Sequence, residues 1–176
     1  MSRWIGPIVV AVLAALAGWY ITLAATPTVI MDLAWERLAT QAGYNRMAHT
    51  PLVVAERQAI VRPSPDLAYS ICSFDLTKGP LEVMANPVPD HYWSLTVFDS
   101  VTNVAFVESD RDSKGAPIRI VLATADQPVT KGARKVIMPD GKGVALIRVL
   151  LKNRGEIGAV DAFRKKSFCR PLKPSS

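Results

Sequence analysis

A long uncharged stretch near the N-terminus constrains this chain more than any other feature of its sequence. No charged residue occurs over residues 4–31, and residues 4–25 are almost all apolar. A bilayer core about 30 Å thick needs about 20 helical residues, because each residue advances a helix by about 1.5 Å. Pro27 is expected to stop the helix, since proline lacks the N–H donor and restricts the residue before it. The sequence therefore predicts a transmembrane anchor over residues 1–27, with residues 4–25 in the bilayer.

The alternative for this stretch is a cleaved signal peptide. Arg3 supplies the positive start that such a peptide needs, and Thr22-Leu23-Ala24 is a weak cleavage site. The apolar run is longer than that of a usual signal peptide, and its ends carry Trp4 and Trp19-Tyr20, as interfacial aromatic belts do. We therefore expect an uncleaved single-pass anchor. Arg3 favours a cytoplasmic N-terminus, which puts the domain outside the cytoplasmic membrane.

The segment over residues 28–50 is expected to link the anchor to a folded domain. Residues 31–42 repeat apolar positions at helical spacing, and Gly43 suits the position just past a helix end. The pattern predicts a short amphipathic linker helix followed by a loop. Such a helix either lies on the membrane surface or packs on the domain, and packing is the commoner outcome.

Residues 51–176 have the pattern of a β domain, with short strands separated by turns and no alternation of strands with helices. This pattern favours a mainly β, antiparallel sandwich or barrel-like fold. Asp140-Gly141 is expected to form a hairpin turn, because both positions tolerate positive φ. Helical spacing and a basic last turn predict one short C-terminal helix over 156–166. The expected strands are 52–54, 59–61, 68–74, 81–84, 92–99, 104–107, 118–123, 135–138 and 144–151.

Composition and motifs exclude several function classes. The net charge of +6 would suggest nucleic acid as a partner, but the positive residues are scattered and form no stripe interleaved with aromatics. The chain has only two histidines, His49 and His91, and no HExxH or CxxC motif. It also lacks a GxSxG elbow and a P-loop. We therefore expect no nucleic acid, metal or cofactor.

The two cysteines, Cys72 and Cys169, leave two alternatives open. In a periplasmic domain they can pair, and a loop of this size would stabilise the fold by about 4 kcal/mol. Otherwise they are buried free thiols, since cysteines in strands behave as small hydrophobes. A nucleophilic role is the least favoured of the three, because neither cysteine lies beside a histidine in the sequence.

Polar residues on or near the expected strands are the candidates for function. Alternation along 92–99 puts Asp99 at the end of a largely apolar face, where a carboxylate needs hydrogen bonds or a cation. Arg62, Arg119 and Arg148 lie on or near strands and are possible partners for it.

Two further candidates, Asp66 and Tyr69, lie where a proline-rich turn meets a strand. Each has a structural alternative, in which Asp66 caps the turn and Tyr69 fills the core. These structural roles are the favoured interpretation over catalysis or binding. The complete candidate functional cluster is Asp66, Tyr69, His91, Asp99 and Arg148.

Two motifs in the first half of the domain resemble those of a bacterial family catalogued as domain of unknown function 1254. Its element Pro-Asp-x-x-Tyr-Ser, then Asp-Leu and Gly-Pro, is similar to Pro65-Asp66-Leu67-Ala68-Tyr69-Ser70, Asp75-Leu76 and Gly79-Pro80. Its element Tyr-x-Ser/Thr-hydrophobic-x-hydrophobic-x-Asp is similar to residues 92–99. The late Arg and helix of the family are similar to Arg148 and 156–166, so the resemblance spans about residues 44–172.

The resemblance implies a jelly-roll-like β-sandwich and no established activity. Longer members of the family carry a companion domain, catalogued as 1214, on the same chain. The short length of this chain suggests that its companion is a separate polypeptide, which would then be its partner protein.

Three functions are consistent with these features. The first, which we favour, is a non-catalytic, membrane-anchored envelope domain that assembles with a partner. The second is an envelope hydrolase or isomerase that uses Asp66, Tyr69, His91 and Asp99. The third is a binding module for a small or lipid-derived ligand inside the sandwich. Convergence of the four residues in one pocket would favour the enzyme, and an exposed apolar patch would favour the assembly domain.

Overall fold

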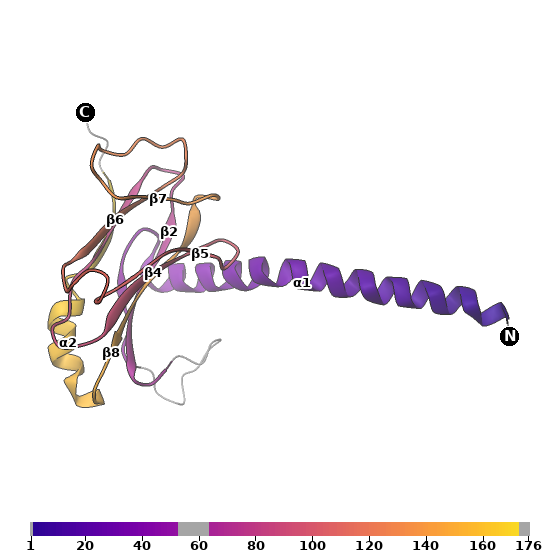
Figure 1. The fold of residues 1–176 in the computed structure, drawn as a ribbon, viewed down its shortest axis with the longest axis horizontal. Coiled ribbons are helices and arrows are strands. Elements are labelled where there is room, and N and C mark those ends of the chain that lie inside the picture. The colour runs from indigo at the N-terminus through magenta and orange to yellow at the C-terminus, as the bar shows by residue number, and fades with distance from the viewer. Residues whose placement is uncertain (1, 53–63, 173–176) are drawn as a thin grey trace.

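The computed structural model describes residues 2–52 and 64–172 and shows one long helix that projects from a β-sandwich (Figure 1). The fold is mainly β, as the sequence predicts. After a short 3-10 turn at Ser2–Trp4, the elements are α1 (Ile5–Ala42), β1 (Ala48–His49), β2 (Leu67–Asp75), β3 (Leu81–Ala85), β4 (Trp93–Asp99), β5 (Val104–Ser109), β6 (Ile118–Ala123), β7 (Lys135–Ile137), β8 (Lys142–Leu150), a 3-10 turn (Arg154–Glu156), α2 (Ile157–Arg164) and β9 (Phe168–Pro171).

The expected anchor and linker helix form one continuous helix, α1, of 38 residues. The prediction that Pro27 stops the helix is wrong, since this residue lies inside α1. Its missing N–H removes only one hydrogen bond of the helix, and the turns on either side continue the ladder. The hydroxyl of Thr26 donates to the carbonyl of Thr22 (2.6 Å), so polar side chains here also bond within the helix.

The last turns of α1 pack on the domain, which is the favoured alternative for the linker helix. Met31 and Ala39 are buried. The indole of Trp35 donates to the carbonyl of Phe74 in β2 (3.0 Å) and stacks on Tyr44 at 4.3 Å between ring centroids. The helix ends where the sequence indicates, because Gly43 adopts a φ of 80° and its N–H closes the last turn.

The strands form two sheets. Sheet A has the order β1-β2-β8-β4-β5, and sheet B has the order β7-β6-β3-β9. All pairings are antiparallel except that of β6 with β7, which is parallel and departs from the expected antiparallel sandwich. The strands expected at 52–54 and 59–61 lie outside the described residues, apart from Leu52. The sequence did not indicate β1 or β9.

The predicted hairpin at Asp140-Gly141 is wrong, because this turn carries the chain from one sheet to the other. It follows β7 in sheet B and precedes β8, which lies between β2 and β4 in sheet A. Met138 is fully buried just before the turn, and the carbonyl of Gly141 accepts a hydrogen bond from Leu76 (2.8 Å). Gly141 does take the expected positive φ, at 64°. The prediction of a turn at this position is therefore right, but the prediction that the turn joins two paired strands is wrong.

The two sheets bury their facing sides in one apolar core. We call these the inner faces, and the opposite sides the outer faces. A disulfide joins Cys72 of β2 to Cys169 of β9 and so connects sheet A to sheet B across the core. The core is formed mainly by Ala68, Phe74, Trp93, Leu95, Val97, Ala145, Ile147 and Val149 from sheet A and by Leu81, Val83, Ala85, Ile118, Ile120 and Leu122 from sheet B.

Candidate functional site

Two members of the candidate cluster meet on the outer face of sheet A. Tyr69 of β2 lies directly opposite Arg148 of β8, and Arg148 lies directly opposite Ser94 of β4. Their neighbours along each strand are buried on the inner face, so alternation directs these three side chains away from the core. The register thus builds a row of Tyr69, Arg148 and Ser94 across the middle of the sheet.

Arg148 is the unusual member of this row. Its Nε atom is buried and has no hydrogen-bond partner among the described residues. The hydroxyls of Ser73, Ser94 and Thr96, all on the outer face, are also buried without a partner there. A buried donor without an acceptor costs free energy, more so when the group is charged. The outer face of sheet A therefore has unused hydrogen-bonding capacity around one cation.

Apolar side chains surround this row. Ile71 and Leu146 lie opposite each other, half-buried, next to Arg148 along β2 and β8. Val107 of β5 is 61% exposed, and Tyr92 and Leu150 are exposed at the far end of the same face. At the other end α1 contacts β2 and β8 and covers the sheet. We call the part not covered by α1, namely Leu67, Tyr69, Ile71, Tyr92, Ser94, Thr96, Val107, Leu146, Arg148 and Leu150, the Arg148 face.

Tyr69 also has a structural role, through its hydroxyl and its backbone. The hydroxyl accepts a hydrogen bond from the N–H of Ser64 (3.0 Å) and so closes the proline-rich turn. Its carbonyl accepts from the N–H and the hydroxyl of Thr50 and from the guanidinium of Arg164. The Pro-Asp-x-x-Tyr-Ser motif therefore fastens α2 and the residue after β1 to β2.

The most deeply buried cation, Arg164, was missed by the sequence analysis, which counted it among the basic residues of the last helical turn. Only 1% of it is exposed. It donates to the carbonyls of Tyr69 and Thr50 and forms an ion pair with Asp161 (2.5 Å). Burial acts to raise the pKa of Asp161, but hydrogen bonds from Lys165 and Arg164 outweigh it, so the pKa lies below its ordinary value. The signal was the spacing of Asp161 and Arg164 by one helical turn.

His49 completes this network on the inner side of β1. Its Nδ1 atom lies 2.9 Å from the hydroxyl of Ser70, which is fully buried. Burial lowers the pKa of His49 below 6.5, and the positive charge of Arg164 lowers it further. A serine with no exposed surface cannot reach a substrate, so the pair of His49 and Ser70 supports the fold rather than a nucleophilic reaction.

Asp99 and Asp66, the two candidate carboxylates, lie apart from the Arg148 face. Asp99 accepts hydrogen bonds from the N–H of Val101 (2.9 Å) and from the N–H and side chain of Asn103. It therefore holds the turn between β4 and β5, and no arginine pairs with it in the described part of the chain. Asp66 is exposed, and its carbonyl accepts from the N–H of Leu151 (2.9 Å). Of the arginines considered for Asp99, Arg62 lies outside the described residues.

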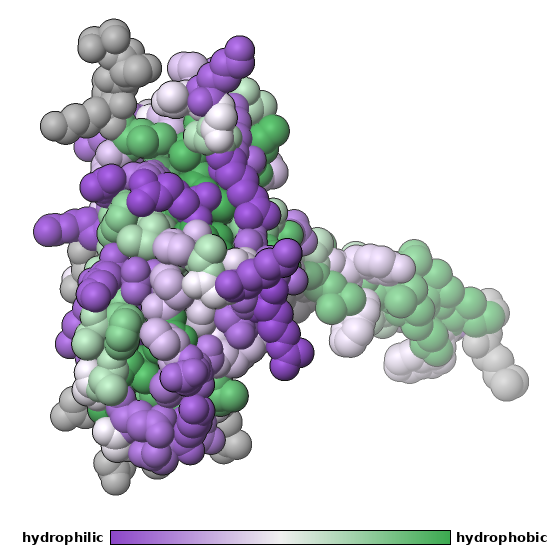
Figure 2. All heavy atoms as spheres, turned by 60° about the vertical axis from the view of Figure 1, so that its left-hand side comes forward, coloured by the Kyte–Doolittle hydropathy of each residue, from purple (hydrophilic) through white to green (hydrophobic). Residues whose placement is uncertain are grey.

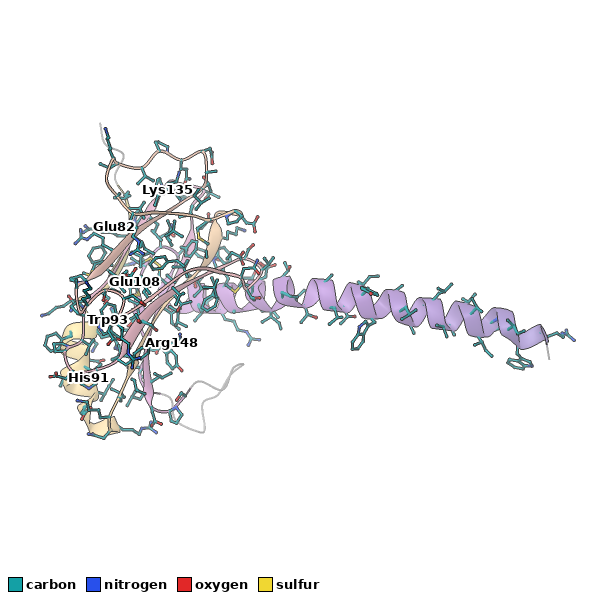
Figure 3. The ribbon with its side chains drawn as sticks, in the orientation of Figure 1. Glu82, His91, Trp93, Glu108, Lys135 and Arg148 are labelled. Atoms are coloured by element: carbon teal, nitrogen blue, oxygen red, sulfur yellow. A yellow bond between two sulfur atoms is a disulfide. The ribbon has the colours of Figure 1, made fainter. Side chains whose placement is uncertain are left out.

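His91 lies in a different region again, beside α2, whereas Arg148 lies on β8 (Figure 3). Its Nε2 atom is 3.1 Å from the carboxylate of Glu156, and its Nδ1 atom is 2.7 Å from the carbonyl of Pro89. The hydrogen bond from His91 lowers the pKa of Glu156. A shallow pocket of about 550 Å³ borders His91 and is also lined by Asp110 and Arg111. The five candidate residues thus occupy separate places, and only Tyr69 and Arg148 are neighbours.

The outer face of sheet B contrasts with the Arg148 face. Glu82 of β3 accepts from Arg119 of β6 (3.0 Å) and from Arg170 of β9 (2.9 Å). The two guanidiniums also lie over the ring of Phe168, at 5.9 and 4.3 Å from its centroid. Within residues 2–52 and 64–172, no group of three His, Cys, Asp or Glu side chains could hold a metal ion.

The fold defines a class of protein: a two-sheet β domain that follows a helix long and apolar enough to cross a membrane. Within that class, the chain belongs to the family described as Protein of unknown function (DUF1254), whose profile matches residues 44–171. The matched residues include β1 to β9 and all the residues that form the Arg148 face. No curated protein matches the sequence.

Two solved structures resemble this fold. The VPA0106 protein from Vibrio parahaemolyticus is 16% identical, with a TM-score of 0.59, over 84% of this chain and 37% of that protein. An uncharacterized protein from Burkholderia cenocepacia is 13% identical, with a TM-score of 0.41, over 66% of this chain and 33% of that protein. At such identities the likeness to the first shows the fold alone. The chain spans roughly a third of the length of each of these proteins.

Proposed function

We propose that this protein is a single-pass, membrane-anchored envelope protein whose β domain binds a partner protein through the Arg148 face. The observation that carries the proposal is the state of that face, where the Nε atom of Arg148 and the hydroxyls of Ser94 and Thr96 are buried without partners among the described residues. A face that was complete in the isolated chain would satisfy these groups or expose them to water. Binding of a second protein would satisfy them.

The membrane part of the proposal rests on α1. The helix has a mean hydropathy of 2.2 in its most apolar window, and that window is 0% buried. Figure 2 shows its outer end as an apolar arm, whereas the surface of the domain in this view is largely hydrophilic. Arg3 favours a cytoplasmic N-terminus by the positive-inside rule. The domain would then lie in the periplasm of the inner membrane, an oxidising compartment that suits the disulfide between Cys72 and Cys169.

The partner that we propose is a separate protein built on the companion domain 1214. In support, the VPA0106 protein has more than half of its chain outside the part that this fold matches. A domain that is joined to a neighbouring domain in longer chains can bind the same type of domain when it is a separate polypeptide. The non-catalytic character of the domain is part of the proposal, and it is supported by the separation of Asp66, His91 and Asp99 from one another.

The test is affinity purification of the full chain, α1 included, from gently solubilised native membranes after cross-linking. We expect one companion-type protein in stoichiometric amount, and the matched control is the same purification from a strain without the tagged chain. Recovery of this protein alone, with its cross-links confined to its own residues, would contradict the proposal.

A second candidate function, binding of a small ligand, is favoured by the pocket beside His91. The Oδ1 atom of Asp110 is buried there without a hydrogen-bond partner among the described residues, and Arg111 lines the same pocket. A ligand with both a donor and an anionic group would suit this pair. If small-molecule extracts of the envelope raise the melting temperature of the wild type and not of Asp110→Asn, the pocket binds a ligand; equal shifts would exclude it.

A further inference from the structure

We infer that the Arg148 face binds a partner segment that presents one carboxylate amid apolar side chains. The inference rests on the proposed function, and it specifies the chemistry of the proposed partner. The carboxylate would pair with the guanidinium of Arg148, and the apolar side chains would cover Ile71, Leu146 and Val107. Each part of this description follows from what the face lacks.

The first step is the hydrogen-bond deficit of Arg148. A guanidinium has five N–H donors and no acceptor, so every group that satisfies it must be an acceptor. Its direct neighbours in the row, Tyr69 and Ser94, do not bond to it: the hydroxyl of Tyr69 is used by Ser64, and that of Ser94 has no partner among the described residues. A carboxylate is the acceptor that matches the planar guanidinium with two parallel hydrogen bonds.

The second step is the charge of the face. In the described part of the chain, the other charged strand residues on the outer face of sheet A are Lys142 and Asp75. Both lie at the end that α1 covers, where Lys142 lies over the ring of Trp35 at 4.9 Å. At the β5 edge, the nearby Asp112 is already bonded to the hydroxyl and the N–H of Ser109 (2.7 and 2.9 Å). The face is therefore a single positive charge inside an apolar surround, and its complement is a single negative charge inside an apolar patch.

A second copy of this chain does not fit that description. A two-fold symmetric contact through the same face would place Arg148 of one copy against the same positive face of the other. Like charges facing each other across an interface disfavour association. Among the described residues, the uncovered part of the face has no carboxylate that could offset the repulsion.

A lipid surface fits less well than a protein segment. Sites that bind anionic headgroups use clusters of about 4–8 Lys or Arg residues. The Arg148 face has one, and its Nε atom is buried. A single, partly buried cation among apolar residues suits one acceptor carried on a shaped protein surface, whereas a headgroup layer suits a cluster of exposed cations.

The experiment uses the full chain in native membranes and a photo-cross-linking amino acid placed at single positions. Val107 on the Arg148 face is the test position, and Ile137 is the matched control, since it has a similar exposure (61% and 57%) but lies on sheet B. We expect Val107 to cross-link to a protein segment that contains an acidic residue flanked by apolar residues, and Ile137 to give no such product. Cross-links from Val107 only to a second copy or only to lipid would overturn the inference.

Charge variants then test the ion pair itself. Arg148→Glu should weaken retention of the cross-linked protein by about 30-fold or more, as loss of a desolvated ion pair does. Arg148→Gln, which keeps the size of the side chain, should also weaken it, and Arg119→Gln on sheet B is the control that should not. Replacement of the acidic residue in the partner by Arg should restore binding to Arg148→Glu.

The outcomes separate the inference from the proposed function. If the wild-type chain retains no protein, the proposed function fails. If it retains one, and both Arg148 variants bind it within twofold of the wild type at an unchanged urea midpoint, only the inference fails. If Arg148→Glu alone fails to fold, Arg148→Gln decides: weakened binding by this variant at an unchanged urea midpoint supports the inference, and binding within twofold of the wild type overturns it.

Discussion

The two outer faces of this sandwich differ in how their arginines are satisfied. On sheet B, Glu82 bonds to Arg119 and Arg170, and both arginines remain largely exposed to water (61% each). On sheet A, Arg148 has its Nε atom buried and no acceptor in the described part of the chain. The arginines on the outer face of sheet B thus have their hydrogen-bond partners in the isolated chain, whereas the Nε atom of Arg148 on the outer face of sheet A has none among the described residues. This difference is the reason for proposing that a partner covers sheet A rather than sheet B.

The two outer faces can be compared only if the two sheets stay packed together. Because the disulfide links the sheets, its removal is expected to change the free energy of unfolding the most. Cys72→Ala with Cys169→Ala removes a link between residues 97 positions apart, which should lower the free energy of unfolding by about 4–5 kcal/mol in the chain-entropy model. Urea unfolding of the full chain in detergent measures this. The reduced wild type is the control and should match the variant; an unchanged urea midpoint would show that packing alone joins the faces.

A smaller effect should follow from disturbing sheet A at its centre. A Cβ at Gly143 would lie 2.1 Å from the carbonyl oxygen of Phe98 and 2.7 Å from the ring of Phe74. Gly143→Ala should therefore cost about 1–3 kcal/mol or more, because backbone must move. Gly158→Ala in α2 is the matched control, since nothing lies within 4 Å of the added carbon and helix propensity favours alanine. Equal urea midpoints for both variants would contradict the packing described for β4 and β8.

The comparison between the faces is tested directly by neutralising one charge on each. Glu82→Gln should lower the free energy of unfolding by about 1 kcal/mol, since it weakens bonds to two exposed arginines. Arg148→Met should leave it unchanged or raise it by up to about 1 kcal/mol, because it removes an unsatisfied buried donor and keeps an apolar stem. Urea titrations of the two variants side by side give the answer. A greater loss for Arg148→Met would mean that its face is complete without a partner.

The smallest effect concerns pH and the network that fastens β1 and α2 to sheet A. Because the pKa of His49 is lowered in the folded state, the unfolded chain binds more protons than the folded chain below about pH 6.5. Stability should therefore be complete above that pH and decline as the pH falls through and below it. His49→Gln should flatten this dependence, measured as the urea midpoint at about pH 7.5 and about pH 5.5. Asp161, whose pKa lies below 3.8, stays ionised in this window. Parallel slopes for both proteins would exclude His49 as the source.

Local pattern in the sequence predicted most of the elements and less of their arrangement. Alternation along β4 correctly put Asp99 at the end of a buried, largely apolar face, because the period of a strand is a local property. The crossing at Asp140-Gly141 could not be told from a hairpin, since both need the same turn residues. The parallel pairing of β6 with β7 depends on contacts distant in sequence, which short-range periodicity does not encode.

For the candidate site too, local pattern indicated individual residues but not which of them lie together. Tyr69 and Arg148 were chosen from separate strands, and only the register of β2 with β8 makes them neighbours. Asp99 needed hydrogen-bond donors, as its position on an apolar face implied, but two backbone N–H groups and the side-chain amide of Asn103 supply them rather than an arginine. The spacing of Asp161 and Arg164 is a local signal for their ion pair, but the burial of Arg164 depends on the carbonyls of Tyr69 and Thr50, which are distant in sequence.

The continuity of α1 has a consequence for how the domain would meet other proteins. A flexible tether lets a domain tumble and sample every heading, but α1 is one helix from the first turn to Gly43, and Trp35 clamps its end to β2. Anchored as proposed, the domain would keep a fixed distance from the membrane and a fixed tilt relative to it. Rotation of the helix about its own axis would point the Arg148 face in each direction parallel to the membrane in turn. The domain and a membrane-bound partner then meet by diffusion in the plane of the membrane, with the Arg148 face held at a constant distance from the bilayer. This raises the effective concentration of the face without adding any contact.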